Sequence, residues 1–215
     1  MPKLTVAIQA GGESRRMGRS KATVPFGGRP LLCRLVERAY PVADELLITT
    51  NEPQNLGFLE DMPEYHKIRL ERDLFDVRGS LTGFCTALTK ASHDYVALCA
   101  CDMMDISHEL FAAELRRAVE GDFDVVVPTN ESGFEPFHAV YRRTSCLEVV
   151  TRLLGEGEKS MKAFILKSGL ATCHFGMNEV HEVVPHGGCF ANCNTPEELA
   201  RAEARIFGPR PACEA

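Results

Sequence analysis

Short apolar strands alternate with amphipathic helices along this chain, and that alternation restricts its fold more than any other feature. Strands are predicted at residues 4–9, 45–50, 95–101, 123–128 and 137–141. Helical spacing of apolar residues predicts helices at 31–39 and 80–91 and after the N-cap residues Ser107 and Thr195. Strands joined through helices pair in parallel and are covered on both faces. The sequence therefore predicts an α/β fold of three layers with a mostly parallel central sheet.

Length and charge narrow the class of protein further. The 215 residues fit a single domain, predicted over 1–207, and Gly208-Pro209-Arg210-Pro211 predicts a frayed tail over 208–215. A formal net charge of -6 argues against binding nucleic acid through bulk charge, so no nucleic-acid partner is expected. The apolar run at 4–8 is too short for a signal-peptide core, and none approaches the roughly 20 residues of a membrane span. A cytoplasmic protein without a membrane partner is predicted.

The nine cysteines are scattered, and no Cys-x-x-Cys occurs among them. Buried free thiols are the favoured interpretation for a reducing compartment. A zinc or iron–sulfur site built from Cys99, Cys101, Cys189 and Cys193 is the weaker alternative, because Cys-x-Cys on a buried strand is not a usual chelating geometry. The seven dispersed histidines are interpreted as structural or exposed.

A glycine-rich, basic loop follows the first strand directly. Its sequence is AGGESRRMGRSK, residues 10–21, in which four cations oppose Glu13 and give a local net charge of +3. Glycines let backbone N–H groups approach anionic oxygens, and clustered cations neutralise them. The spacing is that of neither a P-loop nor Gly-x-Gly-x-x-Gly. The loop predicts phosphate binding, with a solvated turn carrying surface arginines as the alternative.

An aspartate, Asp102, follows the apolar strand at 95–101. In a parallel α/β sheet, ligands bind where the strands end, so this carboxylate is expected at the ligand edge. Magnesium takes one or two carboxylates together with phosphate oxygens and water. Asp102 is therefore predicted as the Mg²⁺ ligand, the alternative being that it only caps the next loop.

These motifs, with others in the same order, resemble the MobA-type nucleotidyltransferases, which are molybdenum cofactor guanylyltransferases. The matching segments are 10–21, Gly28-Arg29-Pro30-Leu31, Asp73 with Gly79-Ser80-Leu81-Thr82-Gly83, 99–103, 135–141 and 190–199. The resemblance implies a three-layer Rossmann-like nucleotidyltransferase fold. Departures from the family pattern are Gln9 in place of an apolar residue, Ser80 in place of proline, and Met104 in place of proline.

The resemblance also implies a role for individual residues. The backbone of Gln9, Ala10, Gly11 and Gly12 would hold guanine, and Asp73 would join the nucleotide site. Lys21 and Arg16 would neutralise phosphate, while Asp102 would contact nucleotide and hold Mg²⁺. Asn192 and Asn194 would face the acceptor. Turn formation before the last helix is an equally favoured interpretation of the two asparagines.

The function implied is transfer of GMP from GTP to molybdopterin, with release of pyrophosphate. The acceptor's terminal phosphate would attack in line, so no side-chain nucleophile is expected, and catalysis would rest on positioning and charge neutralisation. Molybdoenzymes and other cofactor-biosynthesis proteins are further candidate partners. The open alternatives are a cytidylyltransferase for the same cofactor, a sugar-phosphate nucleotidyltransferase, and a non-catalytic nucleotide-binding adaptor.

Overall fold

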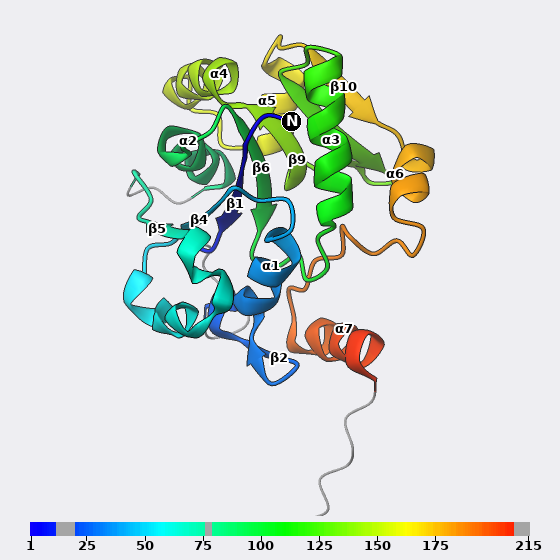
Figure 1. Cartoon of the computed structure of the whole chain (residues 1–215). Coiled ribbons are helices and arrows are strands. Elements are labelled where there is room, and N and C mark those ends of the chain that lie inside the picture. The colour runs from blue at the N-terminus through cyan, green and yellow to red at the C-terminus, as the bar shows by residue number, and fades with distance from the viewer. Residues whose placement is uncertain (12–19, 76–78, 209–215) are drawn as a thin grey trace, which may run out of the picture.

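The protein is described by a computed structural model that covers residues 1–11, 20–75 and 79–208. Within these residues the central sheet has eight strands in the order β10-β7-β9-β6-β1-β4-β5, with β8 paired to β7 (Figure 1). The strands are β1 (Leu4–Gln9), β4 (Glu45–Thr49), β5 (Ile68–Glu71), β6 (Tyr95–Ala100), β7 (Val125–Asn130), β8 (Gly133–Phe134), β9 (His138–Arg142) and β10 (Thr172–Phe175).

Four neighbouring strands, β5, β4, β1 and β6, run parallel, so their carboxyl ends meet at one edge of the sheet. Gln9, the last residue of β1, pairs with Thr49 on one side and with Ala100 on the other. Strand β9 lies antiparallel between β6 and β7, and β10 is parallel to β7. The prediction of a mostly parallel sheet is confirmed, and the end of β1 lies at the centre of its ligand-binding edge.

Helices cover both faces of the sheet because each strand buries side chains on both sides. Ala7 packs with Phe84 of α2 (Ser80–Lys90), whereas Val6 and Ile8 pack in a second cluster with Leu35 of α1 (Leu31–Ala39). The first face is completed by α4 (Arg143–Gly155) and α5 (Met161–Lys167), and the other by α3 (His108–Glu120) and α6 (Met177–Val183). These helices and the sheet are the three predicted layers.

The last helix, α7 (Pro196–Phe207), lies outside these layers and packs on a small hairpin of β2 (Pro25–Phe26) and β3 (Arg29–Pro30). The ring centroids of Phe26 and Phe207 are 5.4 Å apart, and the backbone N–H of Gly27 donates to Glu203 Oε1 at 2.8 Å. The predicted capping box is present, since Thr195 Oγ1 accepts from the N–H of Glu198. This packing holds the segment before α7 close to Lys21, which donates a hydrogen bond to Asn194.

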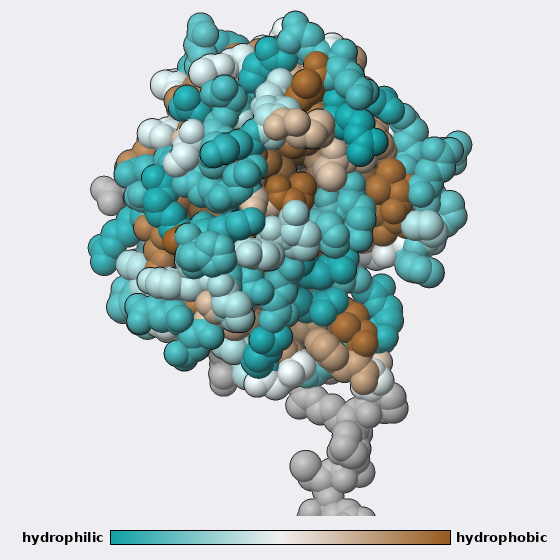
Figure 2. Space-filling view, viewed as in Figure 1, coloured by the Kyte–Doolittle hydropathy of each residue, from teal (hydrophilic) through white to brown (hydrophobic). Residues whose placement is uncertain are grey.

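Short 3₁₀ segments complete the described chain, at Lys21–Thr23, Pro53–Asp61 and Pro63–Lys67. Figure 2 shows that the viewed face is mainly hydrophilic with small separate apolar areas, among them one over α7. Among the described helices, none is both long and apolar enough to span a membrane.

Two strands begin later than the sequence predicts: β7 begins at Val125 instead of 123, and β9 begins one residue late, which matters for the site. The expected strand at 137–141 begins instead at His138. The N–H of His138 donates to the carbonyl of Glu135 at 2.9 Å, which closes a turn before the strand. Phe137 therefore lies in this turn and not in the sheet ladder.

Candidate active site

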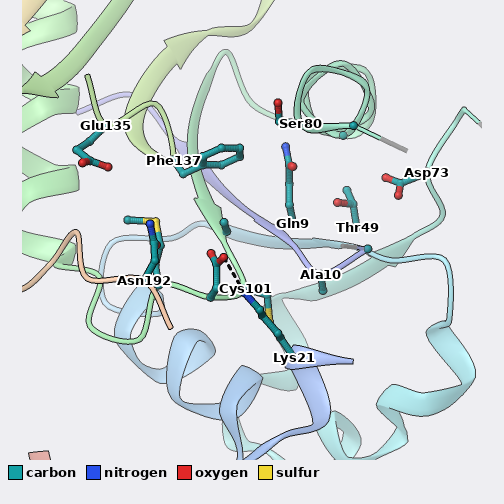
Figure 3. Close-up of a pocket in the computed structure, with 16 residues that line it drawn as sticks. Gln9, Ala10, Lys21, Thr49, Asp73, Ser80, Cys101, Glu135, Phe137 and Asn192 are labelled. Atoms are coloured by element: carbon teal, nitrogen blue, oxygen red, sulfur yellow. Dashed lines mark hydrogen bonds and ion pairs between the residues drawn. The ribbon is translucent and has the colours of Figure 1, made fainter. Parts of the chain in front are cut away.

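A cavity of about 510 Å³ opens at the carboxyl ends of β1, β4 and β6 (Figure 3). Segments from the whole length of the chain meet there. Its lining residues are Gln9, Ala10, Gly11, Lys21, Thr49, Asp73, Gly79, Ser80, Gly83, Ala100, Cys101, Asp102, Met103, Glu135, Phe137 and Asn192. This is the edge at which the sequence predicted ligand binding.

An ion pair occupies the middle of the cavity wall. Lys21 Nζ lies 3.0 Å from Asp102 Oδ2 and donates a second hydrogen bond, of 2.8 Å, to Asn194 Oδ1. The lysine and aspartate side chains are only 17% and 26% exposed. The fold thus brings together a cation, a carboxylate and an amide from the loops after β1 and β6 and before α7, with partial shielding from water.

Backbone and small residues form the wall on one side of this pair. The N–H of Ala10 donates to the carbonyl of Thr49, and the N–H of Cys101 donates to the carbonyl of Gln9. Asn51 Nδ2 donates to Asp73 Oδ2 at 3.0 Å. A Cβ atom added to Gly11 would lie 2.6 Å from that same oxygen, so any larger residue there would force the Asp73 side chain to move.

Asn51 was not among the residues predicted for the site. The signal that could have found it is its place two residues after the end of β4, which pairs with β1. Asp73 lies beyond β5, the next strand along the same edge. Their hydrogen bond links two loops that the parallel order of the sheet makes neighbours.

The side chain of Gln9 points into the cavity (Figure 3). Its Nε2 is buried and has no hydrogen-bond partner among the described residues. Its Oε1 lies 2.7 Å from where a Cβ atom of Gly83 would be, so the glycine leaves room for the amide to cross α2. A buried N–H donor without a partner costs free energy, which is recovered when a ligand oxygen accepts from it.

Side chains form the wall on the other side of the ion pair. Met103 and Asn192 pair through an isolated bridge, and the N–H of Cys193 donates to the carbonyl of Asp102. Glu135 and Phe137, from the turn before β9, complete this wall. Neither was predicted as a site residue, although the segment that contains both was part of the family resemblance.

Buried thiols lie next to the ion pair but are poor nucleophiles. Burial, followed by the nearby charge of Asp102, raises the pKa of the Cys101 thiol to about 12. Burial also raises the pKa of Cys99 far above its usual value. Both remain protonated near neutral pH, whereas the thiolate is the reactive form. All eight cysteines in the described residues are free thiols.

Beneath the loop that carries Asp102 lies a buried polar pair. His138 Nε2 accepts from the N–H of Ser107, and its Nδ1 lies 3.4 Å from Glu114 Oε1; both side chains are fully buried. Ser107 Oγ accepts from the N–H of Leu110 and so caps α3, as predicted. Burial lowers the pKa of His138 to about 3 and raises that of Glu114 well above its ordinary value. The histidine therefore supports the loop after β6 and stays neutral.

The structure brings most of the predicted site residues together. Those that line the cavity are Gln9, Ala10, Gly11, Lys21, Asp73, Asp102 and Asn192. Asn194 reaches it through its hydrogen bond to Lys21. Gly12 and Arg16 lie outside the described residues.

Comparison with known families decides the assignment. A family model for the MobA-like NTP transferase domain matches residues 6–171. The chain belongs to this family. The match confirms the nucleotidyltransferase class that the sequence motifs indicated. It begins in β1 and ends just before β10, so it includes both Lys21 and Asp102.

The curated relatives agree with this assignment. A protein of Desulfosudis oleivorans named molybdenum cofactor guanylyltransferase is 37% identical over 212 residues, which cover 98% of this chain and 99% of the relative. A probable molybdenum cofactor guanylyltransferase of Natronomonas pharaonis is 32% identical over 96% of this chain and all of the relative.

Among solved structures, molybdopterin-guanine dinucleotide biosynthesis protein A from Archaeoglobus fulgidus has a TM-score of 0.78 at 22% identity. The alignment covers 94% of this chain and 97% of that one. The likeness confirms the Rossmann-like nucleotidyltransferase fold.

Proposed function

We propose that this chain transfers GMP from GTP to molybdopterin, releasing pyrophosphate and forming the guanine dinucleotide form of the cofactor. The observation that carries the proposal is the Lys21–Asp102 ion pair at the centre of the cavity, between a wall of backbone and small residues and a wall of side chains. The similarity to curated guanylyltransferases over nearly the whole chain supports GTP and molybdopterin as the substrates. The reaction would take place in the cytoplasm, with molybdoenzymes or other cofactor-biosynthesis proteins as recipients.

GTP would bind along the wall of backbone and small residues. The backbone from Gln9 to Gly12 would hold the guanine, while Asp73, fixed by Asn51, would contact the nucleoside. Lys21 and Arg16 would neutralise phosphate oxygens. Asn192 and Asn194 would face the acceptor, and the hydrogen bond from Lys21 to Asn194 would keep the cation between the two substrates.

The donor set at Asp102 fits Mg²⁺ that arrives with a triphosphate. Among the described residues no group of three or more His, Cys, Asp or Glu side chains could enclose a metal ion. A single partly buried carboxylate beside a phosphate site is nevertheless a usual protein share for magnesium, which takes its other ligands from phosphates and water. When bound there, Mg²⁺ would neutralise charge on the phosphate oxygens.

The chemistry needs no group on the protein to change its covalent bonds. An oxygen of the acceptor's terminal phosphate attacks the α-phosphorus of GTP, forming one P–O bond as the bond to pyrophosphate breaks. The protein holds the reacting groups in line and keeps water away. The Lys21 side chain would neutralise the negative charge that builds on the phosphate oxygens. The protonated state of Cys101 agrees with direct transfer.

A thermal-shift panel with GTP, CTP, ATP and UTP, each with Mg²⁺, tests the proposal. GTP at about 100 times its Kd should stabilise the protein by about 2.7 kcal/mol, and the other nucleotides should do less. Lys21→Ala should remove this stabilisation and lower pyrophosphate release from GTP and molybdopterin roughly a hundredfold or more. Lys3→Ala, at an exposed lysine outside the cavity, is the matched control and should behave as wild type.

Three outcomes would contradict the proposal in different ways. A preference for CTP would indicate the cytidylyltransferase. Nucleotide binding without pyrophosphate release would indicate an adaptor. Near-normal turnover of Lys21→Ala would show that the Lys21–Asp102 ion pair is not needed for the reaction.

A further inference from the structure

The cavity extends beyond the Lys21–Asp102 pair, away from Asp73. Figure 3 shows Asp73 and Glu135 at opposite ends of the site, with the ion pair and the ring of Phe137 between them. The proposed function uses the Asp73 end for the nucleoside and the middle for the phosphates. The Glu135 end is therefore left for the part of the acceptor that lies farthest from its reacting phosphate.

Glu135 is held in place before any ligand arrives. Its backbone N–H donates to the carbonyl of Pro128 at 2.9 Å, and Asn130 Nδ2 donates to its Oε1. The side-chain carbonyl of Asn130 in turn accepts from the N–H of Ser132 at 2.7 Å. The carboxylate is thus fixed by the β7–β8 turn and does not sample the cavity freely.

The carboxylate is half-buried, and burial raises its pKa above the ordinary value, while Asn130 and the nearby Lys162 lower it. None of the ion pairs formed within the described residues involves Glu135. A carboxylate that has lost water and forms no ion pair among the described residues gains from a ligand that offers N–H donors.

Phe137 supplies a flat apolar surface in the same cavity wall as this carboxylate. Its ring points into the cavity (Figure 3), and the turn that holds it is closed by the hydrogen bond from His138 N–H to the carbonyl of Glu135. The hydroxyl of Tyr141 donates to the carbonyl of Pro136 at 2.7 Å and fixes the same turn from below. An aromatic face and a fixed carboxylate in one wall match a flat heterocycle that carries N–H groups on its edge.

We propose that Glu135 and Phe137 form the subsite for the acceptor's fused heterocycle, a 2-amino-4-oxo-pteridine. In such a ring the N3–H and the 2-amino group are adjacent, so both can donate to one carboxylate, and the ring can stack on Phe137. This inference rests on the proposed function, because it takes molybdopterin as the acceptor. A sugar phosphate would offer hydroxyl groups and no ring to stack, so the subsite also argues against that alternative.

Guanine carries the same pair of adjacent donors, so the subsite must be separated from the nucleotide site by experiment. The probe is free pterin, 2-amino-4-oxopteridine, and its control is lumazine, in which an oxygen replaces the 2-amino group. Binding of each at millimolar concentration is measured by saturation-transfer NMR with saturating GTP and Mg²⁺ present. A carboxylate facing the edge should favour pterin over lumazine about tenfold or more in wild-type protein.

Three variants locate that preference. Glu135→Gln should abolish the preference for pterin, and Phe137→Leu should weaken both probes alike. Glu131→Gln, at an exposed neighbour that does not line the cavity, should leave both unchanged. In turnover with molybdopterin, Glu135→Gln should raise the KM for the acceptor about tenfold without altering the thermal shift that GTP produces.

The inference is overturned if wild-type protein binds pterin and lumazine equally or binds neither. It is also overturned if saturating GTP displaces pterin, since the heterocycle then occupies the guanine site. Retention of the pterin preference by Glu135→Gln would assign the recognition to another residue. Failure of the proposed function has a different signature, because GTP would then fail to stabilise even the wild-type protein.

Discussion

The two walls of the cavity are built by different means. The nucleotide wall relies on backbone and on small residues, with Gly11 and Gly83 leaving space that a side chain would fill. The opposite wall relies on side chains, those of Glu135, Phe137 and Asn192. The nucleotide wall therefore requires particular residues in a fixed order along the sequence. The opposite wall requires only that the fold bring suitable side chains to the cavity from separate segments.

The walls also differ in what supports them from below. The nucleotide wall continues directly from the parallel strands β1 and β4, which are largely buried and mostly apolar. The loop after β6 instead depends on the buried polar pair of His138 and Glu114, through the N–H of Ser107. A buried titratable pair directly beneath the loop after β6 predicts that this side of the cavity responds to pH.

The largest effect is expected from Glu114→Gln, which keeps the shape of the side chain but cannot ionise. In wild-type protein, burial raises the folded-state pKa of Glu114, so its contribution to stability is complete below pH 4.5 and is lost as the pH rises toward that pKa. Glutamine mimics the protonated form and keeps a polar group of the same size beside His138 Nδ1. Above pH 4.5 the free energy of unfolding of the Glu114→Gln variant should therefore rise relative to that of wild type, by up to about 1.4 kcal/mol per pH unit.

Chemical denaturation between pH 4.5 and 7.5 measures this gain. Glu120→Gln, at an exposed position on the same helix α3, is the control and should give a curve parallel to wild type. Parallel curves for Glu114→Gln as well would mean that the buried carboxyl is ionised in the folded protein, and that the loop does not rest on a neutral pair.

A smaller effect, on binding alone, is expected from Gly11→Ala in the nucleotide wall. The added Cβ would lie 2.6 Å from Asp73 Oδ2 and 3.4 Å from Asn51 Nδ2, so the aspartate must move. Displacing it should weaken GTP binding about tenfold, or about 1.4 kcal/mol. The free energy of unfolding should change little, because the strained contact lies at the rim of the cavity.

Isothermal titration with GTP and Mg²⁺ gives the binding constant directly. The matched control is Gly57→Ala, since a Cβ atom there meets no other atom within 4 Å. Equal GTP affinity in the two alanine variants would show that close approach of Gly11 to Asp73 is not required, and the contrast between the walls would lose its physical basis.

The same contrast explains what could be predicted from the sequence. Recognition of a ligand through the backbone requires glycines and cations close together in the sequence. Residues 10–21 are therefore recognisable as a phosphate loop from their composition and their place in the chain. The strand ending at Asp102 is recognisable for a similar reason, as an apolar run that stops at a carboxylate. The alternation of elements is enough to predict the parallel sheet and its ligand edge.

Other features of the site arise from long-range packing and leave no local pattern. Asn51 gains its partner Asp73 only because β4 and β5 are adjacent. Phe137 enters the cavity because a turn to Glu135 delays the start of β9, which periodicity alone could not indicate. His138 was interpreted as structural among dispersed histidines, and its support of the Ser107 loop required the antiparallel placement of β9 beside β6.

Gln9 lies at the end of β1, between the two walls, and its replacement should have the smallest effect, with opposite signs for stability and for binding. Leucine has a similar size and removes the buried Nε2 that has no partner among the described residues. Gln9→Leu should therefore raise the free energy of unfolding of the ligand-free protein by about 1 kcal/mol, the lower end of the cost of an unsatisfied buried donor. It should also weaken ligand binding a few-fold, because a ligand oxygen loses that donor.

Thermal unfolding with and without GTP, and again with GTP and pterin together, shows which ligand the amide contacts. A loss of stability in the ligand-free protein would instead mean that the amide is already satisfied, and that β1 ends in a structural residue.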